Sequence, residues 1–182
     1  MKKFQVIFAI LFFTILFLIN FEVIGNSVTD FPGGWLGKWT GKLLIYGEGE
    51  PKEVYMELNI KDAEDANHWK WTIIYGRGEF GQTRAYELIL VDSVKGKFKM
   101  DEKNSIILDM TYRNNSFFST FEVEKNLVTA IYTLIDNKII FEIISSDMKN
   151  PLVTGNEGEE VSTVFSYPVT VVQKAELNKY SE

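Results

Sequence analysis

The 182-residue chain has one histidine and no cysteine, which leaves few side chains able to do chemistry. Side-chain catalysis needs a nucleophile with a base, a metal cluster or a matched pair of carboxylates. His68 opens an expected strand next to a polar connection, and this position favours a surface residue over a general base or a ligand. A transition-metal site would need mostly carboxylates, and a histidine-ligated haem would have to use His68. We therefore expect no metal and no cofactor.

The carboxylates do not form a recognisable catalytic or calcium-binding pattern. Two acidic clusters lack the glycine and the spacing of a calcium loop; they are Asp62, Glu64 and Asp65, and Glu157, Glu159 and Glu160. Asp101 and Glu102 are adjacent, so in a strand they point to opposite faces and make a poor acid/base pair. No nucleophile elbow, phosphate loop or dinucleotide fingerprint is present. The sequence therefore predicts that the protein is not an enzyme.

Polar groups set among aromatic residues point instead to a binding pocket. A pocket lined with Trp and Tyr and carrying an Arg binds an amphipathic or anionic small molecule, because the guanidinium can hold a carboxylate. The candidate ligand-binding residues are Trp71, Tyr75, Arg84, Tyr86, Arg113 and Tyr132. The competing interpretation is that the aromatic residues are ordinary core and that both arginines face water at strand ends.

The elements that would position these residues are strands. From residue 36 onward, apolar and polar residues alternate with period two, and turn residues recur every eight to twelve positions, which is typical of an all-β protein. Strands are expected at 36–46, 54–60, 68–75, 84–91, 97–100, 105–112, 117–123, 127–135, 138–144 and 161–177, the last interrupted at Pro168. Residues 145–160 are expected to be a long loop.

An open sheet of so many strands would leave two exposed edges, and closure removes them. We therefore predict an antiparallel up-and-down β-barrel of about 8–10 strands, with a two-sheet sandwich as the alternative. Which strand face lies inside is left open, because large apolar residues occur on both faces at Ile106–Ile107, Phe117–Phe118 and Ile139–Ile140.

The start of the first expected strand, Gly37-Lys38-Trp39, resembles the Gly-x-Trp motif of lipocalins and the wider calycin superfamily. In that superfamily the Trp closes the floor of the barrel, and a basic residue of the last strand packs over it. The resemblance implies that Lys174 is this basic residue, although the family usually has Arg there. It also implies an up-and-down barrel with a central cavity that carries or sequesters a small molecule.

The N-terminal residues have the layout of a signal peptide. Lys2 and Lys3 precede an apolar run over 4–19, and Val23-Ile24-Gly25 offers a cleavage site. We expect residues 1–25 to be the signal and 26–182 to form one β-barrel domain that is secreted or periplasmic. An uncleaved N-terminal membrane anchor is the alternative.

Composition excludes some partners. Without residues 1–25 the chain keeps 17 basic and 24 acidic residues and has no basic stripe, which disfavours nucleic acid and anionic membrane surfaces. No stable membrane insertion is expected after signal cleavage.

Two functions are favoured over a third, a structural or envelope-associated domain without a small ligand. The first is an exported binding protein that sequesters or carries an amphipathic, apolar or anionic small ligand in its barrel cavity. The second is a protein-interaction or inhibitor-like domain that acts through the loops 76–83 and 145–160 and has no small ligand. The oligomeric state is left open.

Overall fold

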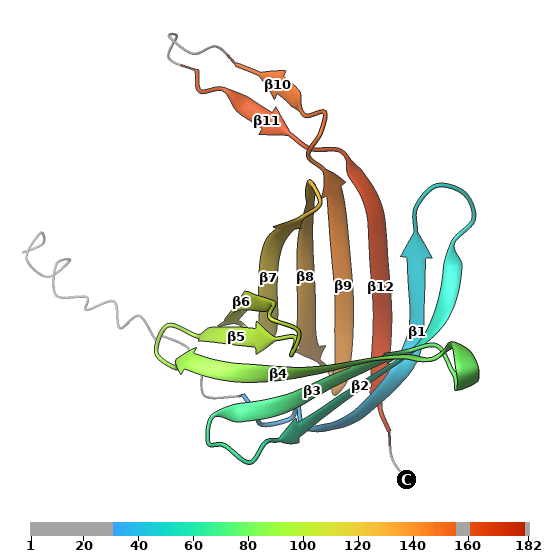
Figure 1. Cartoon of the computed structure of the whole chain (residues 1–182), viewed down its shortest axis with the longest axis vertical. Helices are drawn as coiled ribbons and strands as arrows, with labels where there is room; N and C mark the ends of the chain where they lie inside the picture. The colour runs from blue at the N-terminus through green and yellow to red at the C-terminus, as the bar shows by residue number, and fades with distance from the viewer. Residues whose placement is uncertain (1–30, 156–160, 181–182) are drawn as a thin grey trace, which may run out of the picture.

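A single sheet closes on itself in the computed structural model of the chain, which describes residues 31–155 and 161–180 (Figure 1). The closed barrel has the strand order β1-β12-β9-β8-β7-β6-β5-β4-β3-β2, and every pairing is antiparallel. This confirms the predicted barrel over the sandwich. The expected signal segment lies outside the described residues.

The barrel strands are β1 (Gly37–Tyr46), β2 (Lys52–Asp62), β3 (His68–Tyr75), β4 (Gln82–Asp92), β5 (Lys97–Asp101), β6 (Ile107–Arg113), β7 (Ser116–Val123), β8 (Asn126–Ile135), β9 (Lys138–Asp147) and β12 (Val169–Lys179). A short 3-10 turn, η2 (Gly78–Phe80), joins β3 to β4. In the described part of the chain, no helix is long and apolar enough to cross a membrane.

Paired residues with positive φ explain the tight connections of the meander. Asn114 and Asn115 have φ values of 46° and 54°, and Asp136 and Asn137 have 49° and 58°. Two successive residues with positive φ match the twist of a two-residue hairpin, and Asn and Asp tolerate positive φ better than most residues. Both turns agree with the sequence prediction.

The structure settles which face of each strand lies inside. On β3, Trp69, Trp71 and Ile73 are buried, whereas Lys70 is exposed. On β7, Phe117 is fully buried and its neighbour Phe118 faces outward. Successive side chains of a strand alternate between faces, so one such assignment fixes the rest of the strand.

Aromatic rings close one end of the barrel. Phe31 and Trp35 precede β1, are buried, and lie edge-on against Phe117 at centroid distances of 5.1 and 5.2 Å. Trp39, at the start of β1, is also fully buried, and its indole N–H donates to the Trp35 carbonyl at 2.8 Å. Offset and edge-on ring pairs add to the stabilisation from burial alone. This end of the barrel is therefore a packed floor, as the Gly-x-Trp resemblance implied.

The basic residue over Trp39 is Lys179, which corrects the expectation for Lys174. The Lys179 ammonium lies 5.1 Å from the centre of the Trp39 ring. Lys174 is exposed on the outer face and bonds Glu142 of β9 at 3.0 Å. The reason is register: β12 continues to Lys179, which pairs with Trp39, whereas Lys174 pairs with Leu44 and points outward.

The expected loop at 145–160 contains strand structure. β9 extends to Asp147, and β10 (Leu152–Thr154) pairs with β11 (Val164–Ser166) as a separate two-stranded sheet. Figure 1 shows this ribbon standing away from the barrel. The ribbon contains few apolar residues, but these have high strand propensity. The polar residues around them hid this strand signal in the sequence. Residues 156–160 lie outside the description.

Candidate ligand pocket

A pocket of about 560 Å³ occupies the end of the barrel opposite the aromatic floor. Its position follows from strand direction: Trp39 at the start of β1 belongs to the floor, and Ile45 near the end of β1 lines the pocket. The same holds on β3, where Trp69 lies at the floor and Tyr75 at the pocket. Ligand sites in proteins are typically concave spaces of roughly 300–1,000 Å³, so the size suits a small organic molecule.

One side of the pocket is apolar. Leu43 and Ile45 of β1, Val54 of β2 and Ile143 of β9 line it, and Leu43 is buried almost completely. Register explains the grouping, since Leu43 pairs directly with Val54 and with Ala175 on its two neighbouring strands. Burial of apolar ligand surface against this wall would supply affinity without orientation.

The other side is polar and carries charges of both signs. Arg84 of β4 lines the pocket, and within residues 31–155 and 161–180 it has no hydrogen-bond or ion-pair partner. Glu102 follows β5 and faces the same space; its carboxylate accepts a 3.3 Å hydrogen bond from Asn104, and no described Lys or Arg forms an ion pair with it. An unpaired guanidinium in a pocket is available to hold a carboxylate by a forked contact.

Two tyrosines, Tyr75 and Tyr86, line the pocket together with Arg84 and Glu102, and a third, Tyr132, is buried in the core. Burial raises the pKa of Tyr75 to about 12, and the neighbouring Tyr86 adds to the effect. Burial, and then the Glu102 carboxylate, raise the pKa of Tyr86. Burial also holds the pKa of Tyr132 well above its ordinary value. All three side chains therefore keep their protons at neutral pH and can donate hydrogen bonds.

Three of the six predicted ligand-binding residues line the pocket: Tyr75, Arg84 and Tyr86. Trp71 and Tyr132 are buried in the core instead, with their rings edge-on at 5.2 Å. They do not line the pocket.

Arg113 does not belong to the pocket. It is exposed at the end of β6, and its guanidinium donates to the Tyr112 carbonyl at 2.7 Å. Because Tyr112 is buried and points inward, the next residue must point outward. The competing interpretation of this arginine, a strand end that faces water, is the one that the structure supports.

Sequence reasoning missed Glu102, Gln173 and Phe80, which also line the pocket. Glu102 had a usable signal, since it continues the alternation of the buried Phe98 and Met100 and therefore falls on the inner face. Gln173 is in phase with buried Ala175 on β12. Phe80 had no such signal, because it lies in the short 3-10 turn η2, where side chains do not follow the period-two alternation of a strand.

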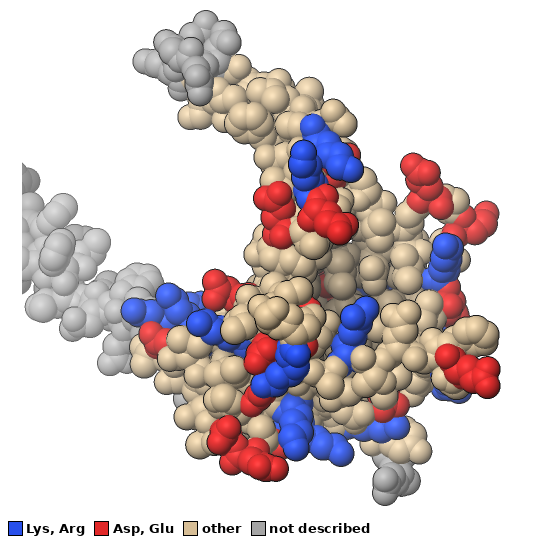
Figure 2. Space-filling model, in the orientation of Figure 1, with Lys and Arg blue, Asp and Glu red and all other residues tan. Residues whose placement is uncertain are grey.

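Figure 2 shows the distribution of charge on one face of the molecule. Lys and Arg alternate there with Asp and Glu, and neither sign forms a continuous patch on that face.

Comparison with solved structures shows similarity of fold. The structure of an S-type phycobiliprotein lyase from Guillardia theta superposes with a TM-score of 0.60 over 89% of this chain and 98% of that chain, at 10% sequence identity. A protein of unknown function from the DUF3598 family of Nostoc punctiforme gives a TM-score of 0.53 over 80% of this chain and 48% of that chain, at 14% identity. No family model matches the sequence, and no curated protein matches it.

Proposed function

We propose that the protein binds a small amphipathic molecule with a carboxylate group in the pocket of about 560 Å³ at the open end of its barrel. Arg84 holds the carboxylate, the hydroxyls of Tyr75 and Tyr86 donate hydrogen bonds, and the apolar part of the ligand lies against Leu43 and Val54. The observation that carries the proposal is Arg84, which lines the pocket with Tyr75 and Tyr86 and has no hydrogen bond or ion pair within residues 31–155 and 161–180.

The similarity of fold supports a ligand-binding barrel. One neighbour is named a phycobiliprotein lyase. At 10% identity its residues do not transfer to this chain. The neighbour's name is the reason to include a linear tetrapyrrole in a panel of probes that also contains fatty acids, haem and aromatic acids.

Native mass spectrometry of the protein purified gently from its own cells tests the proposal. We expect an excess mass that is lost on organic extraction, and recovery of the same mass when the matching probe is added back. A bare polypeptide mass, together with a melting temperature that no probe raises, would contradict it. A mass that survives denaturing conditions would instead indicate covalent attachment.

Export is part of the same proposal. The positive start and apolar run of residues 1–25 favour a cleaved signal, so the mature protein should begin near Asn26. N-terminal sequencing of the protein recovered outside the cytoplasm tests this. An intact Met1 on membrane-bound protein would favour the anchor.

A second candidate function is protein interaction through the β10–β11 ribbon. Leu152, Val153, Val164 and Phe165 are all more than half exposed there. A two-stranded ribbon is marginally stable alone, so contact with another protein would stabilise it. Removing 150–166 should abolish capture of such a partner and leave probe binding unchanged.

A further inference from the structure

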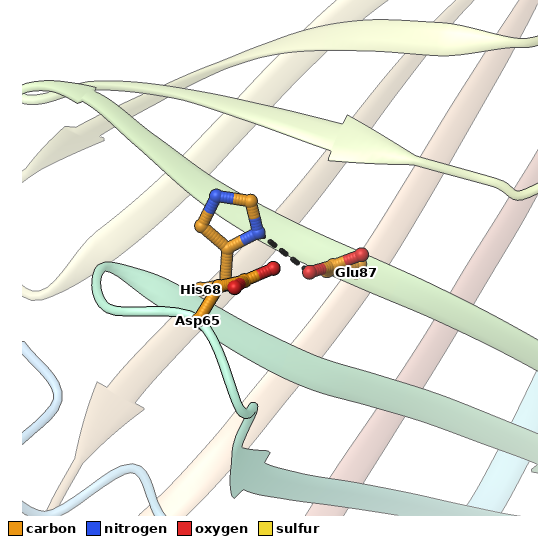
Figure 3. A group of neighbouring side chains, drawn as sticks. All are labelled: Asp65, His68 and Glu87. Atoms are coloured by element: carbon orange, nitrogen blue, oxygen red, sulfur yellow. Dashed lines mark hydrogen bonds and ion pairs between the residues drawn. The ribbon is translucent and has the colours of Figure 1, made fainter.

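Three potential metal ligands meet on the outside of the barrel, away from the pocket described above. Asp65, His68 and Glu87 each offer one ligand atom, and these atoms all lie within 4.8 Å of one another. Figure 3 shows the three side chains converging. Asp65 comes from the loop before β3, His68 from the start of β3 and Glu87 from β4. His68 Nδ1 is 2.6 Å from Glu87 Oε1.

Backbone hydrogen bonds hold this group in place. The loop between β2 and β3 closes through Ala63 N to His68 O at 3.1 Å and His68 N to Asp65 O at 3.3 Å. Asn67 adopts a φ of 64°, and its carbonyl accepts from Leu90 N at 2.9 Å, which fastens the loop to β4. Asp65 and His68 are therefore fixed opposite Glu87 by main-chain contacts, so the arrangement does not depend on surface side chains alone.

We propose that Asp65, His68 and Glu87 form a binding site for a divalent transition-metal ion, with Zn²⁺ as the first choice. One imidazole nitrogen and two carboxylate oxygens suit Zn²⁺ and its first-row neighbours, whereas Ca²⁺ takes six to eight oxygens. Ligand atoms around tetrahedral zinc lie roughly 3.3–3.6 Å apart, as follows from bond lengths near 2.0–2.2 Å. Reaching this geometry requires His68 Nδ1 and Glu87 Oε1, now 2.6 Å apart, to separate around the ion, in a group whose ligand atoms all lie within 4.8 Å of one another.

The surroundings leave room for the ion and also set a limit on its affinity. A groove of about 370 Å³, lined by residues that include Asp65 and Glu87, gives space for water as a fourth ligand. Lys103 contacts Glu87 Oε2 and bonds Asp101 at 3.1 Å, so it orients the carboxylate and leaves Oε1 towards His68. Its positive charge opposes a cation nearby, and removing that charge should strengthen binding.

His68 is the only histidine, so a tag-free wild-type chain reports on the site directly. Proton NMR of the full-length protein would follow the imidazole C–H signals during addition of ZnCl₂, and then of CoCl₂, which broadens nearby signals. We expect one saturating shift of these two signals, and calorimetry should give one zinc per chain. Imidazole signals that do not move at millimolar zinc would overturn the proposal.

Variants then identify the other ligands. His68→Gln, Asp65→Asn and Glu87→Gln should each weaken zinc binding by about 10-fold or more, the range in which loss of a ligand or its outer partner acts. Lys103→Met should tighten binding several-fold, which a merely structural role for the group does not predict. Glu53→Gln, which breaks a surface ion pair with Lys42, is the matched control and should leave zinc binding unchanged.

Unchanged zinc affinity in His68→Gln would overturn the proposal even if the chain binds zinc elsewhere. Circular dichroism without metal checks that each variant folds. Arg84→Met should retain full zinc affinity, so the outcome here is separate from that of the ligand pocket.

Discussion

The Lys179 ammonium lies 5.1 Å from the centre of the Trp39 ring, and the two residues are register partners on β12 and β1. These are the last and first strands of the barrel along the chain, so the contact lies where the sheet closes on itself. A cation over the face of an indole is attracted by the ring quadrupole. The pair therefore helps to fix the register in which the barrel closes.

The first prediction concerns this pair. A double-mutant cycle of Trp39→Leu and Lys179→Met should give a coupling free energy of about 0.5–1 kcal/mol, as for cation–π pairs at exposed sites. Urea unfolding of the four proteins measures it. Lys174→Met is the control and should show no coupling to Trp39, since Lys174 bonds Glu142 on the outer face. Stronger coupling to Lys174 than to Lys179 would contradict the register.

The second prediction tests the close approach of β1 to β12. A Cβ added at Gly41 would lie 2.2 Å from the Glu176 carbonyl oxygen, so Gly41→Ala forces the strands apart. We expect a loss of about 1–3 kcal/mol in the free energy of unfolding, as for overpacked cores. Gly47→Ala is the matched control, because its Cβ would meet nothing closer than 3.8 Å. Equal stability of the two variants would argue against this strand contact.

The third prediction separates the two arginines that the sequence nominated. Arg84→Met should weaken binding of a carboxylate-bearing probe about 10- to 150-fold, because a hydrogen bond to a charged group contributes about 1.5–3 kcal/mol. Arg113→Met should leave affinity unchanged, since Arg113 is exposed outside the pocket. Fluorescence titration or calorimetry with the probe found by mass spectrometry measures both. Equal losses in the two variants would remove Arg84 from its assigned role.

The fourth prediction is a loss of stability at alkaline pH. Tyr75 ionises near pH 10 when unfolded, and folding raises its pKa to about 12. The folded chain then binds more protons than the unfolded chain between these values, so stability is full below pH 10 and falls as pH rises towards 12. The slope for one such group is about 1.4 kcal/mol per pH unit.

Urea unfolding at several pH values between 9 and 12 would measure this slope. Tyr75→Phe removes one ionising group and should make the slope shallower. Tyr46→Phe is the control, because Tyr46 is exposed at the end of β1. A slope that Tyr75→Phe leaves unchanged would mean that this hydroxyl is not held protonated by the fold.

Part of the pocket could be read from the sequence, and the physical reason is alternation along single strands. Tyr75 is in phase with Trp69 and Trp71 on β3, and Tyr86 is in phase with Arg84 on β4, so the residues of each strand were correctly placed on one face. Depth along the barrel axis was not readable. Trp71 and Tyr132 share the inner face with Tyr75 yet lie below the pocket, because register between strands sets their height.

The sequence by itself determined the class of fold, because period-two alternation and paired Asn or Asp turns act over a few residues and need no distant partner. Only the tertiary structure decided which face closes inward, that Lys179 and not Lys174 covers Trp39, and that Phe80 lines the pocket. It also decided that Asp65 and His68 meet Glu87, about twenty residues away along the chain. Such meetings depend on strand register and barrel closure, which arise from pairing across the whole sheet.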